Sequence, residues 1–262
     1  LPRESLYWHF PHYGVHSPLQ APKDLTKKYE RVPQADRQGK PVYAAMVESI
    51  DNSVGRVLDA LRASGKEDDT LIIFTSDNGG FYKATSNAPL RANKGAYYEG
   101  GIRIPLIIKW PGVAQAGRVI QEPVISNDLY PTCLAAAGIA MNPHQHIDGI
   151  SLRPLLDETD ELPRESLYWH FPHYNKHPSS YPSSVIRKGD WKLIESFDPA
   201  QVELYNLRAD LGETTNLAED EPVRREALLQ ELEAWRTAVG AERMRPNPRA
   251  TMNASRVDAF GL

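Results

Sequence analysis

The stretch Thr70–Gly80, TLIIFTSDNGG, decides the fold expected for this chain. As far as Ser76 it is a continuous apolar run rich in branched side chains, which is typical of a strand buried on both faces of a parallel sheet. Asp77 and Asn78 follow where that strand should end. Because open α/β sheets bind ligands at the carboxyl ends of their strands, these two residues are candidate ligand-binding residues.

The segments around this stretch complete an α/β pattern. Residues 40–64 carry apolar side chains at intervals of three and four, with Pro41 in the first turn and Gly65 after the last, which predicts a helix. Residues 104–110, IPLIIKW, predict a second buried strand, and residues 127–137 predict another helix. A helix followed by a buried strand is half of a βαβ unit.

The C-terminal part has a different pattern. Residues 184–196 predict a β-hairpin whose turn is Lys188-Gly189-Asp190, and residues 202–205 and 167–171 predict further strands. Residues 222–239 predict a helix with one apolar face. Together they predict a small α+β subdomain with an antiparallel sheet.

One segment is duplicated without change. Residues 1–13 read LPRESLYWHFPHY, and residues 162–174 repeat the same letters. Structural repeats diverge in sequence and recur at a fixed period, and this lone copy does neither. We expect the first copy to be out of place, through a join of unrelated sequences or a recent duplication. A swapped strand is the alternative.

These patterns divide the chain into four parts. Residues 1–13 are the duplicated segment, 14–157 the later part of an α/β domain, 158–242 the antiparallel sheet with its helix, and 243–262 a tail.

Composition excludes several classes of protein. The chain has 24% charged residues and a formal net charge of -4, so no strong field favours a nucleic-acid partner. Its apolar runs are shorter than the ~20 residues that a membrane-spanning helix needs. A single cysteine excludes an intrachain disulfide.

The polar end of the opening stretch suits a hard cation. Asp77 and Asn78 offer two oxygen ligands of the kind that calcium prefers, and Gly79-Gly80 lets the backbone turn sharply beside a bound group. An ordinary turn is the alternative, because Asp-Asn-Gly is also common turn chemistry.

A lysine loop follows. Lys94, in Arg91–Gly95, RANKG, could act as a point charge for an oxyanion or be a solvated surface lysine. Glu99 and Arg103 are spaced to pair with each other and brace this loop.

Six segments, taken together, resemble the sulfatase family, of the arylsulfatase type within the alkaline-phosphatase-like superfamily. They are TSDNGG (75–80), LRANKGAYYEGGIRIPLIIKWPG (90–112), NDLYPTCLAAAG (127–138), IDGISLRPLL (147–156), VIRKGDWKLIES (185–196) and VELYNLRADLGETTNLAE (202–219). GVHSPLQAP (14–22) is similar to the family's histidine segment. The resemblance implies the C-terminal portion of an alkaline-phosphatase-like α/β sandwich domain, followed by the small α+β subdomain.

The resemblance also implies a reaction and a set of site residues. Sulfatases hydrolyse sulfate esters with a formylglycine nucleophile, which is made from a Cys/Ser-x-Pro/Ala-x-Arg motif, and with one Ca²⁺ ion. By this resemblance Asp77 and Asn78 are metal ligands, Lys94 binds the sulfate, and His16 binds the sulfate and assists the leaving oxygen. Lys94 and His16 are thus the expected catalytic and substrate-binding residues.

The sequence departs from the family pattern in three ways. It contains no Cys/Ser-x-Pro/Ala-x-Arg motif, Asn93 replaces a small residue before Lys94, and its cysteine, Cys133, lies on an apolar helix where packing is the expected role. The formylglycine and two further Asp ligands are expected in the N-terminal half of a complete sulfatase. We therefore expect the 262-residue chain alone to be inactive.

Partners and location follow by analogy only. A sulfated small molecule or sulfated glycan is the expected substrate, and a periplasmic or secreted location is expected. Two rival functions stay open. One is a phosphodiesterase or phosphonate hydrolase of the same superfamily, and the other is a non-catalytic module that binds sulfated glycans through Lys94 and residues 168–181.

Overall fold

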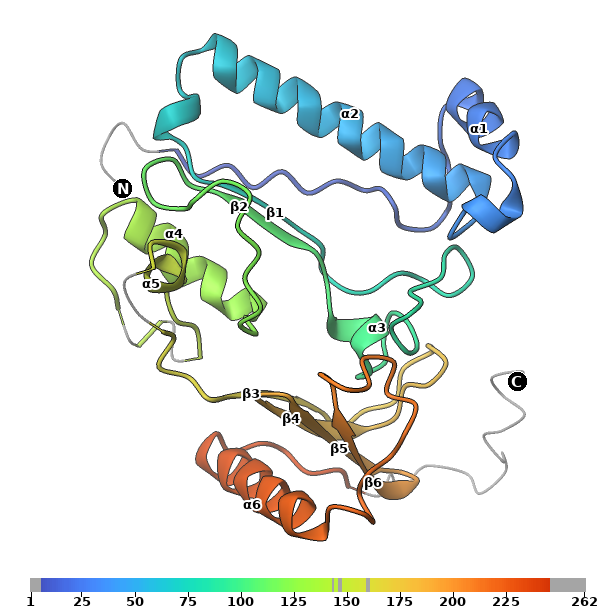
Figure 1. The fold of residues 1–262 in the computed structure, drawn as a ribbon, viewed down its shortest axis with the longest axis vertical. Coiled ribbons are helices and arrows are strands. Elements are labelled where there is room, and N and C mark those ends of the chain that lie inside the picture. Colours follow the sequence, from blue (N-terminus) through green and yellow to red (C-terminus); the bar gives the residue numbers. More distant parts are fainter. Residues whose placement is uncertain (1–5, 143, 146–147, 159–160, 246–262) are drawn as a thin grey trace. The chain divides into compact units, whose positions relative to one another are not determined.

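The computed structural model describes residues 6–142, 144–145, 148–158 and 161–245 (Figure 1). Its helices are α1 (Lys23–Glu30), α2 (Pro41–Ala63), α3 (Glu99–Ile102), α4 (Leu129–Ala136), α5 (Arg153–Leu156) and α6 (Pro222–Ala238). Its strands are β1 (Ile72–Thr75), β2 (Leu106–Lys109), β3 (Ser166–Phe171), β4 (Ser183–Lys188), β5 (Trp191–Phe197) and β6 (Ala200–Asn206). None of the helices among these residues has the length and apolar character to cross a bilayer.

The chain forms two compact units. Unit 1 comprises Leu1–Thr75 and Pro105–Arg164, and unit 2 comprises Ser76–Ile104 and Glu165–Leu262. The segment that carries Asp77, Asn78 and Lys94 therefore belongs with the C-terminal sheet. The four-part division at residues 13, 157 and 242 stays a prediction, and most of the tail, residues 246–262, lies outside the described residues.

The long helix of unit 1 confirms the prediction for residues 40–64. α2 begins with Pro41 at its first position. The backbone nitrogen there makes no hydrogen bond within the helix, so the missing N–H of proline costs nothing. α2 ends just before Gly65, whose φ of 67° lies in the left-handed region that suits glycine after a helix. Ala45 and Met46 are its buried residues, and α1 packs against it.

The two strands of unit 1 differ from the prediction. β1 pairs with β2 in antiparallel register, from Ile72 opposite Lys109 to Thr75 opposite Leu106. Phe74 is 38% exposed and Ile107 63%, so the expectation that each segment is a strand of a parallel sheet, buried on both faces, is wrong for these residues. An apolar run indicates that a strand suits burial, but it holds no information about the direction of its partner.

The helix predicted over residues 127–137 is present as α4, preceded by a 3₁₀ turn at Ser126–Asp128. Gly138 follows it with a φ of 64°. A hydrophobic core around Leu152, Leu156 and Leu162 packs against apolar residues of β2, including Ile108.

The C-terminal sheet of unit 2 confirms the predicted antiparallel subdomain. Its strand order is β3-β4-β5-β6, all neighbours antiparallel, and Figure 1 shows α6 lying along it. On the α6 side the core residues are Ile186, Leu193, Leu204, Ala218, Leu228 and Leu232. A second core is formed by Ala96, Tyr98, Val185, Ile194, Tyr205 and Leu207. The sheet thus packs against α6 through one core and against the lysine loop through the other.

The two identical segments have different structures. The second copy forms β3, paired with β4 along its whole length. The described part of the first copy, residues 6–13, has no helix or strand, and Leu6, Trp8 and Phe10 are exposed. These contacts support the expectation that the second copy is in its proper context, which stays a prediction.

Candidate anion and metal site

Backbone hydrogen bonds bring the Asp77–Asn78 loop and the lysine loop together. The Lys94 N–H donates to the Gly80 carbonyl at 3.0 Å, and the Gly79 N–H donates to the Gly101 carbonyl at 2.9 Å. Three of the four predicted site residues, Asp77, Asn78 and Lys94, therefore lie on adjoining loops of unit 2.

Asn87 fastens these loops through its side chain, and the sequence analysis missed it. Its Oδ1 accepts the Gly80 N–H at 2.9 Å, and its Nδ2 donates to the carbonyls of Gly80 and Ala92, both at 3.1 Å. All of these partners are backbone groups, so no pattern of side chains in the sequence could have identified this role.

The charged side chains of Asp77 and Lys94 differ from that of Arg91, which pairs with Glu203 at 3.8 Å. Within the part of the chain that the structure describes, neither the Asp77 carboxylate nor the Lys94 ammonium has a hydrogen-bond or ion-pair partner. Asp77 is exposed and Lys94 is half-buried. A half-buried ammonium without a carboxylate partner suits an anionic ligand.

The donor chemistry at Asp77 and Asn78 fits calcium, but two side chains supply only part of its coordination. Calcium takes about six to eight oxygen ligands. No group of three or more His, Cys, Asp or Glu side chains that could hold a metal occurs among the described residues. These two residues would therefore be a partial ligand set for the ion.

The fourth predicted residue, His16, belongs to unit 1. Its side chain is exposed, Nδ1 lies 2.7 Å from the Ser17 carbonyl oxygen, and the ring meets the Tyr13 ring edge-on at 6.0 Å between centroids. That His16 shares a pocket with Lys94 stays a prediction.

An aromatic and basic loop lies against the lysine turn. Asn175 Nδ2 donates to the Gly95 carbonyl at 3.2 Å, and its Oδ1 accepts the His177 N–H at 2.8 Å. The His177 ring covers Gly95, whose φ is 91° and where an added Cβ would lie 2.6 Å from the His177 side chain. Burial, together with the charge of Lys94, lowers the pKa of His177. The clustering of histidines and aromatics in residues 168–181 was the signal for this loop.

The lowered pKa of His177 gives a direct test of its closeness to Lys94. We expect Lys94→Met to raise the pKa of His177, because a nearby positive charge no longer opposes protonation. An NMR titration of the histidine ring protons measures it. Lys83→Met, which removes an exposed lysine of the same segment, should leave the His177 pKa unchanged. Equal titration curves for wild type and Lys94→Met would contradict this arrangement.

Two structural roles expected from the sequence are also visible. Glu99 and Arg103 form the predicted ion pair, at 3.7 Å, and Glu99 is buried. Cys133 is a half-buried free thiol whose pKa is raised by burial, so it is a poor nucleophile.

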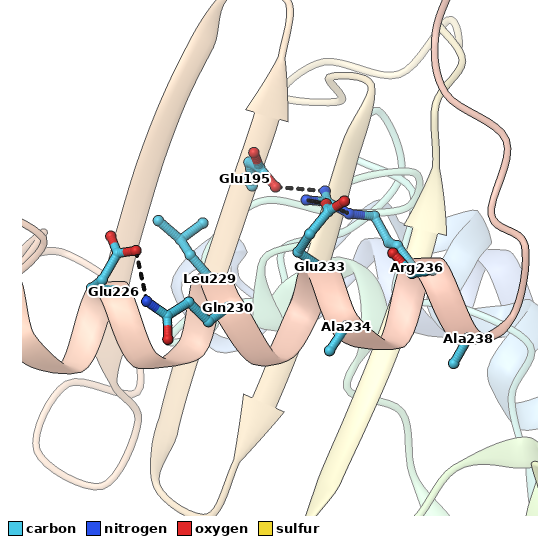
Figure 2. Close-up of a pocket in the computed structure, with 9 residues that line it drawn as sticks. Glu195, Glu226, Leu229, Gln230, Glu233, Ala234, Arg236 and Ala238 are labelled. Atoms are coloured by element: carbon cyan, nitrogen blue, oxygen red, sulfur yellow. Dashed lines mark hydrogen bonds and ion pairs between the residues drawn. The ribbon is translucent and has the colours of Figure 1, made fainter.

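A shallow hollow on α6 and β5 has the wrong charge for a sulfate site (Figure 2). It has a volume of about 800 Å³, and its lining includes Glu195, Glu226 and Glu233. Arg236 is already paired with Glu195 at 2.5 Å and with Glu233 at 2.7 Å. The remaining negative charge would repel an anion.

Comparison with known proteins identifies the family. The family model described as Sulfatase matches residues 4–139, and the model described as N-sulphoglucosamine sulphohydrolase, C-terminal, matches residues 92–238. The chain belongs to the sulfatase family. Its α/β fold with an antiparallel C-terminal sheet is that of the solved sulfatases it resembles.

Individual relatives agree with this assignment. A sulfatase of Formosa agariphila is 41% identical over 233 residues, which is 82% of this chain and 42% of the relative. The structure of Ps i-CgsB in complex with k-i-k-neocarrahexaose is 32% identical with a TM-score of 0.74, covering 85% of this chain and 48% of that one. The structure of BT4656 in complex with its substrate D-glucosamine-2-N,6-O-disulfate is 30% identical with a TM-score of 0.65, covering 75% and 40%. The chain thus spans less than half the length of these relatives.

Proposed function

We propose that this chain is the C-terminal portion of a sulfuric ester hydrolase, which in the complete protein cleaves a sulfate ester to an alcohol and sulfate. The observation that carries the proposal is the 3.0 Å hydrogen bond from the Lys94 N–H to Gly80, which holds an unpaired ammonium beside the Asp77–Asn78 loop. Membership of the sulfatase family supports the same reaction.

Each residue has a distinct proposed role. Asp77 and Asn78 hold a calcium ion through their side-chain oxygens, and the ion, when bound, supplies positive charge next to the sulfate. Lys94 binds a sulfate oxygen and stabilises the charge that develops during the reaction. His16 gives a proton to the leaving oxygen, which would otherwise depart as an alkoxide. In the sulfatase family the formylglycine lies in the N-terminal half of the complete protein. The 262-residue chain by itself is therefore expected to release no sulfate.

The substrate class is a sulfated glycan or a smaller sulfated molecule. The substrate of BT4656 is a sulfated amino sugar, and this similarity supports a sulfated sugar as the substrate of the complete protein. The loop of residues 168–181, which Asn175 fastens to the lysine turn, offers the His177 imidazole for a sugar hydroxyl. A periplasmic or secreted location remains part of the proposal by family analogy.

The test is binding of inorganic sulfate to the 262-residue chain, measured by calorimetry with and without calcium. Lys94→Met should weaken binding about 10- to 100-fold, because one charge-assisted hydrogen bond is lost. Lys83→Met is the matched control and should bind as wild type does. Equal affinity in all three proteins would overturn the role of Lys94, and no binding to wild type would overturn the site.

A further inference from the structure

A buried group of three charges includes Glu99, which follows the lysine loop in the sequence. Lys192, Glu99 and Glu213 are 0%, 1% and 0% exposed. Lys192 Nζ lies 3.0 Å from Glu99 Oε1 and 2.8 Å from Glu213 Oε1. Glu213 Oε2 accepts the Glu99 backbone N–H at 2.6 Å. The group joins β5, the start of α3 and the loop after β6.

Stability alone does not account for this group. Burying charges is costly, and well-packed apolar residues are often as stable as a buried ion pair. Glu99 also has Arg103 and Arg187 within 3.7 and 3.8 Å, but Lys192 is the cation that both carboxylates share, and burial raises the pKa of Glu213. Glu213 also has a φ of 51°, an uncommon conformation for a side chain of this size. In some proteins buried ionic groups fix a particular backbone geometry, whatever their effect on stability.

What the group fixes is the backbone that holds the candidate site. Glu99 is followed by two glycines that bind both site loops. The Gly100 N–H donates to the Arg91 carbonyl at 2.8 Å, on the lysine loop, and the Gly101 carbonyl accepts the Gly79 N–H at 2.9 Å, next to Asn78. A shift of Glu99 would therefore move both loops relative to each other.

A second anchor acts on the other side of the lysine turn. Arg91 Nη1 donates to the Tyr205 hydroxyl at 2.7 Å and to the Glu213 carbonyl at 2.8 Å. Its guanidinium also stacks on the Tyr98 ring, 3.8 Å from the centroid. Glu213 thus holds Arg91 through its carbonyl and Glu99 through its carboxylate, so the lysine turn is fixed before and after Lys94.

We propose that Lys192 and Glu213 are positioning residues, which hold the Asp77–Asn78 loop and the Lys94 turn at the spacing that an anion needs without touching the anion. This inference rests on the proposed function for its effect on binding. Its structural part, the fixing of the two loops, does not.

The test compares Lys192→Met with a control variant that loses stability elsewhere. Lys192→Met keeps the length of the side chain and removes the charge. We expect about tenfold weaker binding of inorganic sulfate, since small displacements of binding groups have large effects. We also expect faster hydrogen exchange at the Gly79 and Gly100 amides. Leu232→Ala, in the core under α6, lowers stability but should keep both the affinity and the exchange of these amides.

Each outcome decides part of the proposal. Wild-type affinity and exchange in Lys192→Met would overturn it, and so would an equal loss of affinity in Leu232→Ala at the same melting temperature. If Lys192→Met does not fold, Glu213→Gln gives the same readouts with the Glu99 N–H acceptor retained. If the wild-type chain binds no sulfate, the proposed function fails, while the exchange at Gly79 still tests the positioning.

Discussion

Gly79→Ala should abolish sulfate binding by this chain and lower its free energy of unfolding by about 3 kcal/mol. A Cβ at this position would lie 1.8 Å from the Gly100 carbonyl oxygen and 3.1 Å from the Gly101 Cα. Both are backbone atoms, so no side chain can rotate away to make room. The chain must either break the hydrogen bond from Gly79 to Gly101 or displace the loop that follows Lys94.

Urea unfolding and calorimetry with inorganic sulfate measure the two effects. Gly55→Ala is the control, because an added Cβ there meets nothing within 4 Å and the residue lies inside α2. It should raise the free energy of unfolding by about 0.5 to 1 kcal/mol, since alanine favours helix more than glycine does. Sulfate binding by Gly79→Ala at wild-type affinity would show that the close packing of the two loops is not needed for the site.

The elements of regular structure were predictable because their signals are local. The spacing of apolar residues in 40–64 and 222–239 predicted α2 and α6, and Lys188-Gly189-Asp190 predicted the turn between β4 and β5. The direction of β1 relative to β2 was not predictable from the same kind of signal. Strand pairing depends on residues far apart in the sequence, and an apolar run such as 70–76 fits either direction.

Within the candidate site, only the side chains expected to bind the metal or the anion were predictable. Asp77, Asn78 and Lys94 follow a motif, and the structure places them on adjoining loops. The residues that hold those loops were not found, because Asn87 binds only backbone groups. The sequence predicts Lys192 only as a strand residue of the hairpin, and the structure is needed to show that its side chain is buried. Whether His16 joins these residues stays a prediction.

Arg164→Met should lower the free energy of unfolding by about 3 to 5 kcal/mol, because it leaves a buried carboxylate without its counter-charge. Arg164 donates from Nη1 to Asp128 Oδ1 and from Nη2 to Asp128 Oδ2, at 2.7 Å each, and Asp128 is 0% exposed. The same carboxylate accepts the backbone N–H groups of Ile125 at 2.9 Å and Ile150 at 3.0 Å. It therefore links the turn before α4, the segment before α5 and Arg164, which lies two residues before β3.

Urea unfolding, together with hydrogen exchange at the Ile125 and Ile150 amides, measures the loss. Arg62→Met is the matched control, because the Arg62 side chain is 61% exposed and its pairs with Asp59 and Glu67 lie at the surface, and it should change stability by less than about 1 kcal/mol. Adding Asp128→Asn to Arg164→Met should restore part of the lost stability, since the second change removes the unpaired charge. A loss below about 1 kcal/mol in Arg164→Met would mean that solvent or another cation compensates Asp128.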